Sequence, residues 1–270
     1  MAELKEGFVQ AAGYRTHYWE GGTGENVLLL HSADPGSGGR QEFRHNLGVL
    51  SDRFHVVAPD QIGFGKTDPP PSLLTHPTYV EHILAFMDAV RLQRTHLIGN
   101  SRGGLVAISI AGEHADRVGR VILAGNAGGG IPPEMVKQAL SLFADYTPGR
   151  ENLRTVLQRS YFDLDRNMSP EMFDEYLEAS TRQYEAYARL GGYPMDVPNL
   201  RAVLAGLTMP VMFFFGKEDK VFAIEQGLVG FVNTPGSRFY GFSSCGHHPQ
   251  GEHPKEFNRL AIDFLTGELA

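Results

Sequence analysis

The stretch Leu97-Ile98-Gly99-Asn100-Ser101-Arg102-Gly103-Gly104 decides how this chain is interpreted. An apolar run ends in it and the helix-forming residues 105–108 follow at once, so the pattern predicts a strand, a sharp turn and a helix. A serine between glycines on such a turn is typical of a nucleophile held at the end of a sheet. Gly99 and Gly103 fit this interpretation, because strand and helix approach closely there and a Cβ would collide. A plain turn serine is the alternative for Ser101, so the rest of the chain must supply a base, an acid and oxyanion donors.

The composition limits the classes of protein and partner. The chain has 270 residues, enough for a full core, and its net charge of −7 comes without any block of Lys or Arg. Nucleic acid and anionic membranes are therefore not expected as partners, and a small-molecule substrate is. One cysteine, Cys245, excludes an internal disulfide framework and a cysteine-rich zinc site. With neither a secretory signal nor an apolar run of about 18 residues, we expect a cytoplasmic protein.

Apolar runs alternate with amphipathic helical patterns along the chain. Continuous apolar runs are typical of strands buried on both faces, so the fold class is α/β, a mostly parallel sheet with helices on both faces. Right-handed crossovers place the loops after the strands at one edge, where ligands bind in such sheets. Ser101 and the small-residue loops 31–39 and 63–67 share that edge. Besides the strand before Ser101, the expected strands are 8–10 and 16–19, an opening antiparallel pair, then 26–30, 54–60, 118–124, 211–215 and 237–242.

A helical insertion interrupts this alternation. We expect a first core part over 1–127, a helical lid over 128–207 and a second core part over 208–270. Lid helices are predicted at 132–143, 151–162 and 170–190. The lid aromatics indicate either an apolar or aromatic ligand or, as is commoner at helical spacing, the lid's own core. They are Phe143, Tyr146, Phe162, Phe173, Tyr176 and Tyr184.

Helical spacing also marks two segments of the core. Phe43, Leu47 and Leu50 follow one another at this spacing after the first small-residue loop. The residues 256–265 form an amphipathic pattern that closes the chain.

A serine hydroxyl needs a base within hydrogen-bond reach, and the base needs a carboxylate to fix its tautomer. Asp219 follows the strand 211–215 by a short turn, and His247 follows the last strand, which gives the chain order Ser, Asp, His. Glu218 is the alternative acid and His248 the alternative base. A metal site built on these histidines and His253 is not expected, because a third ligand at workable spacing and its supporting shell are missing.

At this point the chain resembles a known family. The segments Gly99-Asn100-Ser101, Gly216-Lys217-Glu218-Asp219, Cys245-Gly246-His247 and Glu252-His253-Pro254-Lys255-Glu256-Phe257-Asn258 are similar to those of the α/β-hydrolases, particularly the meta-cleavage product hydrolases of aromatic degradation. The similarity runs through nearly the whole chain and is weakest in the lid. It implies the α/β-hydrolase fold, a lid, no cofactor, and hydrolysis of a C–C bond in a vinylogous diketone acid.

The oxyanion hole is expected from two backbone N–H groups. One belongs to Arg102, the residue after the nucleophile, and the other to Ala33 in the loop after the third strand. A main-chain donor does not depend on its side chain, so both residue types are compatible with this role.

Three positions depart from the pattern of the C–C hydrolases. Tyr176 falls where the resemblance implies a lid arginine, and Arg182, less than two helical turns later, is the alternative. Glu42 stands in place of an asparagine, and His248 in place of a tryptophan. We expect Glu42, Tyr176 and His248 to contact substrate and to set its identity.

The sequence therefore predicts a hydrolase with a Ser101-His247-Asp219 triad that attacks a carbonyl. The bond cleaved is a C–C bond of a meta-cleavage product or, alternatively, the ester bond of a small apolar or aromatic ester or lactone. A non-hydrolytic lyase or a ligand-binding receptor on the same fold is the second alternative, because fold alone does not give function. A homo-oligomer is left open.

Overall fold

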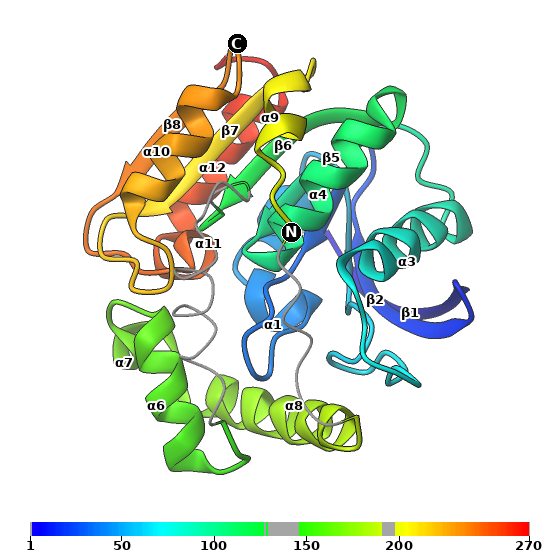
Figure 1. Cartoon of the computed structure of the whole chain (residues 1–270), viewed down its shortest axis with the longest axis vertical. Helices are drawn as coiled ribbons and strands as arrows, with labels where there is room; N and C mark the ends of the chain where they lie inside the picture. The colour runs from blue at the N-terminus through cyan, green and yellow to red at the C-terminus, as the bar shows by residue number, and fades with distance from the viewer. Residues whose placement is uncertain (1, 127, 129–145, 191–197, 270) are drawn as a thin grey trace.

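The computed structural model describes residues 2–126, 128, 146–190 and 198–269. Its centre is an eight-stranded sheet with the order β1-β2-β4-β3-β5-β6-β7-β8 (Figure 1). β1 and β2 are antiparallel to each other and β2 to β4, whereas the strands from β4 to β8 are parallel. The predicted fold class is confirmed. The strands are β1 Leu4–Ala11, β2 Tyr14–Gly21, β3 Asn26–Leu30, β4 His55–Pro59, β5 Thr95–Asn100, β6 Val118–Ala124, β7 Val211–Gly216 and β8 Arg238–Phe242.

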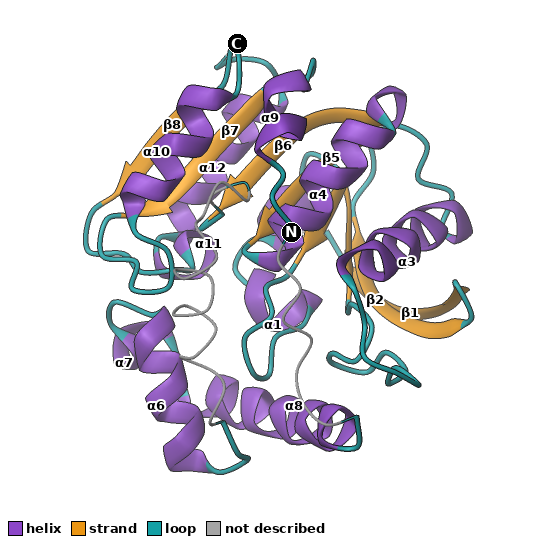
Figure 2. Ribbon diagram, viewed as in Figure 1, coloured by secondary structure: helices purple, strands orange, loops and turns teal. Residues whose placement is uncertain are grey.

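Helices cover both faces of this sheet (Figure 2). Alternate side chains of β3 show the two faces, because successive residues of a strand point to opposite sides. Leu28 and Leu30 pack in the cluster that contains α3 and α4, while Val27 and Leu29 pack with α1, α2 and α12. The apolar run of β3 is thus buried on both faces. The helices of the core are α1 Gly39–Phe43, α2 Leu47–Ser51, α3 His76–Ala89, α4 Arg102–Glu113, α9 Arg201–Gly206, α10 Ile224–Asn233, α11 Pro249–Glu252 and α12 Pro254–Leu265, with a 3-10 turn at Ala115–Arg117.

The segment with Phe43, Leu47 and Leu50 forms two short helices, α1 and α2. All three side chains are buried, as helical spacing predicts, but the chain turns between the helices. Asn46 lies in this turn, and its side-chain amide donates to Gln250 O at 3.1 Å and to Asn258 Oδ1 at 2.7 Å. These partners are more than 200 residues away, so a local pattern does not reveal the break.

Three helices lie beyond the carboxyl ends of the strands, between β6 and β7 in the chain (Figure 1). α6 (Arg150–Ser160) and α8 (Pro170–Ala188) match the predicted helices 151–162 and 170–190, and α7 (Leu164–Asn167) is an additional turn. The predicted helix 132–143 lies outside the described residues, as does Phe143. Tyr146, Phe173 and Tyr176 pack in a separate apolar cluster within the lid. Of the two interpretations of the lid aromatics, this packing matches the lid's own core. No helix of the described segments is long and apolar enough to cross a membrane.

Candidate active site

Ser101 occupies a strained turn between β5 and α4. The strand ends at Asn100 and the helix begins at Arg102, so one residue makes the whole connection. Ser101 has φ 50° and ψ −117°, a region that residues with a side chain adopt at a cost of about 1–3 kcal/mol. A Cβ at Gly99 would lie 2.5 Å from the carbonyl carbon of Gly103. A Cβ at Gly103 would lie 2.1 Å from the carbonyl oxygen of Leu30. The steric role predicted for both glycines is confirmed.

Asn100 connects this turn to the loop that carries His247. Its side-chain amide donates to Ala124 O at 3.0 Å and to His247 O at 3.0 Å. The backbone N–H of Ser101 donates to the same Ala124 oxygen at 3.0 Å. Sequence reasoning quoted Asn100 only as part of a motif and missed this function, which depends on a strand and a loop that are distant in the chain.

Asp219 and His247 meet at the carboxyl ends of β7 and β8. His247 Nδ1 lies 2.8 Å from Asp219 Oδ2, and both side chains are fully buried. The other oxygen, Oδ1 of Asp219, accepts from the N–H groups of Val221 at 2.8 Å and Phe222 at 2.9 Å. These bonds fix the carboxylate, which in turn fixes the ring. Among the described residues, His247 Nε2 is a buried atom with no hydrogen-bond partner.

The alternative acid and base have other partners. Glu218 accepts from the N–H of Cys245 at 3.1 Å, so its carboxylate supports the loop before His247. His248 pairs with Asp34, its Nε2 lying 2.9 Å from Asp34 Oδ2. No group of three or more His, Cys, Asp or Glu side chains within the described ranges is arranged to hold a metal ion.

The loop after β3 is held by a buried carboxylate. Both Glu42 oxygens accept from the N–H of Ser32, at 3.0 and 2.9 Å, and Oε1 also accepts from the Ser32 hydroxyl. Ser32 Oγ in turn accepts from Asp34 N at 3.1 Å. Ala33, the predicted oxyanion donor, lies between these two anchored residues. The substrate contact expected of Glu42 stays a prediction, and what the structure shows is a carboxylate that holds the backbone before Ala33.

Arg102 is the first residue of α4, so its N–H lies at the positive end of the helix. Its guanidinium carbon lies 4.7 Å from the ring centre of Tyr79, in cation–π contact. The Tyr79 hydroxyl is 2.9 Å from that of Tyr187, on α8. The backbone N–H of Arg102 therefore lies beside Ser101, and its side chain packs on Tyr79 of α3, the residue that joins α3 to α8.

His248 forms a buried ion pair beside His247. Its ring centre lies 5.3 Å from that of His247, and it stacks on Tyr161 at 4.7 Å. Burial opposes protonation, but the hydrogen bond and charge of Asp34 outweigh it and raise the pKa of His248 to about 9. Burial also opposes ionisation of Asp34, and the contact with His248 nevertheless holds the pKa of Asp34 below its usual value. At neutral pH the pair is therefore charged on both sides.

Tyr176 and Arg182, the two lid residues considered for substrate contact, differ in burial. Tyr176 is buried, and loss of hydration raises the pKa of its hydroxyl. A Cβ at Gly36 would lie 2.4 Å from Tyr176 O, so α8 lies directly on the first loop. Arg182 is half exposed, pairs with Glu178 and donates to Gly65 O at 3.3 Å. Its guanidinium therefore lies at the surface, and its role as a replacement for a lid arginine stays a prediction.

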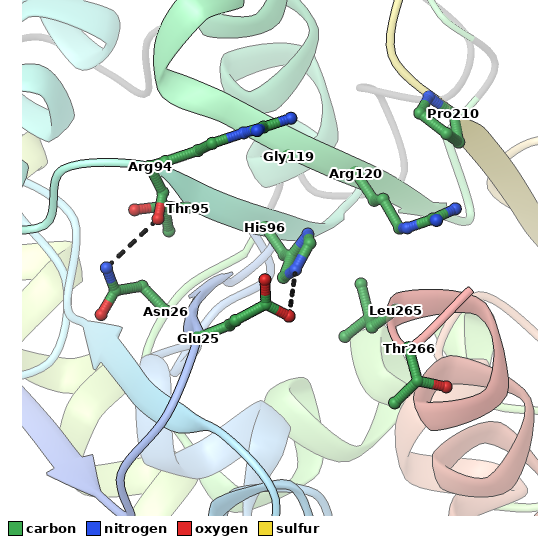
Figure 3. Close-up of a pocket in the computed structure, with 10 residues that line it drawn as sticks. All are labelled: Glu25, Asn26, Arg94, Thr95, His96, Gly119, Arg120, Pro210, Leu265 and Thr266. Atoms are coloured by element: carbon green, nitrogen blue, oxygen red, sulfur yellow. Dashed lines mark hydrogen bonds and ion pairs between the residues drawn. The ribbon is translucent and has the colours of Figure 1, made fainter. Parts of the chain in front are cut away.

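A cavity of about 480 Å³ lies at the opposite edge of the sheet, at the amino ends of β3 and β5 (Figure 3). Its polar groups interact with one another: Asn26 Nδ2 donates to Arg94 O at 3.2 Å, and His96 Nε2 lies 3.6 Å from Glu25. None of the predicted site residues lines it. This cavity is therefore separate from the candidate active site.

Comparison with known proteins agrees with the fold. The profile of the Alpha/beta hydrolase family matches residues 27–260. A 2-hydroxy-6-oxo-6-phenylhexa-2,4-dienoate hydrolase from Comamonas testosteroni is 33% identical, over 98% of this chain and 99% of its own length. A 2-hydroxymuconate semialdehyde hydrolase from Pseudomonas putida is 30% identical, over 96% of this chain and 93% of its own length.

Solved structures give the same picture. The meta-cleavage product hydrolase CumD from Pseudomonas fluorescens IP01 is 29% identical and superposes with a TM-score of 0.88 over 98% of each chain. The carboxylesterase CesB from Bacillus subtilis has a TM-score of 0.81 at 21% identity, covering 98% of this chain and 92% of its own, which is a likeness of fold alone. This chain belongs to the α/β-hydrolase family. It is an enzyme of that family and resembles its meta-cleavage product hydrolases.

Proposed function

We propose that this protein is a serine hydrolase in which Ser101 attacks a carbonyl carbon. His247 is the base, and the carboxylate of Asp219 orients it. The observation that carries the proposal is the fixed, buried pair of Asp219 and His247, whose Nε2 has no partner among the described residues. Asn100 joins the loop of this histidine to the strained turn of Ser101. A nucleophile, its base and an orienting carboxylate form the arrangement that covalent catalysis requires.

In the proposed mechanism, His247 Nε2 takes the Ser101 proton as Oγ bonds to the carbonyl carbon. Asp219 keeps the proton on Nδ1 and stabilises the imidazolium that forms. The N–H groups of Ala33 and Arg102 stabilise the oxyanion. The bond to the leaving group then breaks, His247 returns the proton to that group, and water hydrolyses the acyl-enzyme with the same base. No cofactor takes part in these steps.

Two bonds are candidates for cleavage. The named relatives favour a C–C bond next to a ketone, as in the ring-fission products after which they are named. The ester bond of a small ester or lactone is the second candidate. One observation favours the ester. Glu42 is an acidic side chain buried against the loop of Ala33, and it offers no positive charge to the carboxylate that a ring-fission product carries.

A fluorophosphonate probe tests the nucleophile. We expect one label per chain at Ser101, lost in Ser101→Ala and retained in Ser72→Ala, a change at an exposed serine. Ser101→Ala should also abolish turnover of a dienol-keto acid and of an aryl ester, assayed side by side. Turnover that survives in Ser101→Ala would show that Ser101 is not the nucleophile and would favour a lyase.

A further inference from the structure

The backbone of the segment Gly246-His247-His248 is held by acceptors from outside the segment. The N–H of Gly246 donates to Glu252 Oε1 at 2.8 Å, and the N–H of His248 donates to the same oxygen at 3.4 Å. Between them, the N–H of His247 donates to Ser160 O at 2.7 Å. All three N–H groups therefore have a fixed acceptor, although the segment lies outside helices and strands.

The carboxylate of Glu252 also bonds to the lid. Its second oxygen, Oε2, accepts from the N–H of Phe162 at 2.8 Å. Phe162 lies two residues beyond the end of α6, and Ser160, the acceptor for the N–H of His247, is the last residue of that helix. Hydrogen bonds therefore run in both directions, because His247 donates to the lid and the lid donates to Glu252.

These bonds lie in a tightly packed, buried place. A Cβ at Gly246 would lie 2.5 Å from Ser160 O and 2.8 Å from Phe162 N, so the two stretches of backbone are in direct contact. Glu252 is only 6% exposed, and a bond lost here would leave a buried polar group unpaired. Burial raises the pKa of Glu252, and the hydrogen bonds from Phe162 and Gly246 counteract this shift. The carboxylate is therefore stabilised by the same N–H groups that it holds.

We infer that Glu252 is a positioning residue, whose carboxylate fixes the backbone on both sides of His247 and ties it to the end of α6. The inference rests on the proposed function, in which His247 is the base. Asp219 bonds to the ring and sets its rotation, whereas Glu252 sets the position of the backbone that carries the ring. A catalytic group displaced by about 1 Å can lose about 10²-fold in rate. The lid thus takes part in placing the base.

Glu252→Gln tests this role, because it keeps the size of the side chain but replaces one acceptor oxygen with a donor. It cannot accept from both the lid and the His247 segment. With 4-nitrophenyl butyrate, kcat per Ser101 labelled by fluorophosphonate should fall by about 10–100-fold, with little change in KM. Counting labelled sites excludes misfolded chains from the rate. Glu256→Gln makes the same change of charge at a residue bonded to the Tyr240 hydroxyl, and it should keep the wild-type kcat. A wild-type kcat in Glu252→Gln would overturn the inference.

Hydrogen exchange in the wild type keeps the inference testable if Glu252→Gln does not fold or the ester is not a substrate. The N–H groups of Gly246 and Phe162 should exchange about 100-fold or more slowly than in an unstructured chain, although both lie in loops. In Glu252→Gln this protection should fall, while that of Val221, which donates to Asp219, should remain. Unprotected N–H groups at Gly246 and Phe162 in the wild type would contradict the inference. A failure of fluorophosphonate to label wild-type Ser101 would instead count against the proposed function, because exchange at these groups does not depend on the nucleophile.

Discussion

The imidazole of His247 and the carboxylate of Asp219 form a 2.8 Å hydrogen bond in which both side chains are fully buried. Burial removes competing water, and two backbone N–H groups hold the second carboxylate oxygen. The ring therefore has one stable orientation and one tautomer, with the proton on Nδ1. This orientation is what makes Nε2 available to accept a proton from Ser101 in the proposed mechanism.

Asp219→Asn should change the tautomer of His247 while leaving the position of its ring nearly unchanged. An amide at this position offers an N–H where a carboxylate oxygen accepted, which favours the wrong tautomer of His247. We expect kcat to fall by roughly 10³–10⁴ with little change in KM, as in other triads. Glu218→Gln is the matched control, because Glu218 accepts from Cys245 N and does not contact His247. Similar losses in both variants, measured as initial rates, would contradict the assignment of the acid.

Gly103→Ala tests the steric argument for the turn of Ser101. The new Cβ would lie 2.1 Å from Leu30 O, which is backbone and cannot move alone. We expect the free energy of unfolding to fall by about 1–3 kcal/mol or more, as for other overpacked sites, with loss of activity. Gly206→Ala at the end of α9 is the control, since a Cβ there meets no atom within 4 Å. Urea unfolding of the two variants gives the comparison, and equal stability would show that the turn can relax.

Cys245 should be inert in the native protein. Its side chain is fully buried, and burial together with the nearby carboxylates of Glu252 and Asp219 raises the pKa of the thiol. Because the thiolate is the reactive form, iodoacetamide at pH 8 should label the native chain far more slowly than the chain in urea. Fast native labelling would mean that the loop carrying His247 opens readily.

Most of the fold could be predicted because its signals are local. The runs in β3 and β7 are apolar throughout, and turn residues bound them, so these strands were placed within one residue of their observed ends. The break between α1 and α2 was not predicted, and Asn46 within it bonds to Gln250 and Asn258, which are distant in the chain. Local sequence does not contain such partners.

The candidate site also divides into features with local sequence signals and features that depend on residues distant in the chain. Asp219 and His247 were found because each follows a strand at the expected place in the chain, and the structure brings them together. The pairing of His248 with Asp34 joins residues 214 positions apart, so the sequence did not reveal it, and the substrate contact expected of His248 stays a prediction. Glu42 was likewise expected to face substrate, and its bonds to Ser32 became visible only in the folded chain.

The ion pair of Asp34 and His248 makes stability depend on pH in a defined window. The pKa of His248 is about 9 in the folded protein against an ordinary 6.5, so the folded chain binds more protons between these values. Its contribution is complete below about pH 6.5 and is lost as the pH rises through 9. From pH 6 to 10 the free energy of unfolding should therefore fall by an extra amount of the order of 1–3 kcal/mol.

His248→Gln should remove this extra pH dependence, because glutamine does not titrate and still donates a hydrogen bond to Asp34. Urea unfolding at pH 6, 7.5, 9 and 10 measures the slope for wild type and variant. His114→Gln is the control, since His114 forms no ion pair with any described residue, and it should keep the wild-type slope. If His248→Gln also keeps that slope, the proton on His248 is not stabilised by Asp34. If the unfolding free energies of wild type and His248→Gln change differently only between pH 6.5 and 9, the titrating proton belongs to His248.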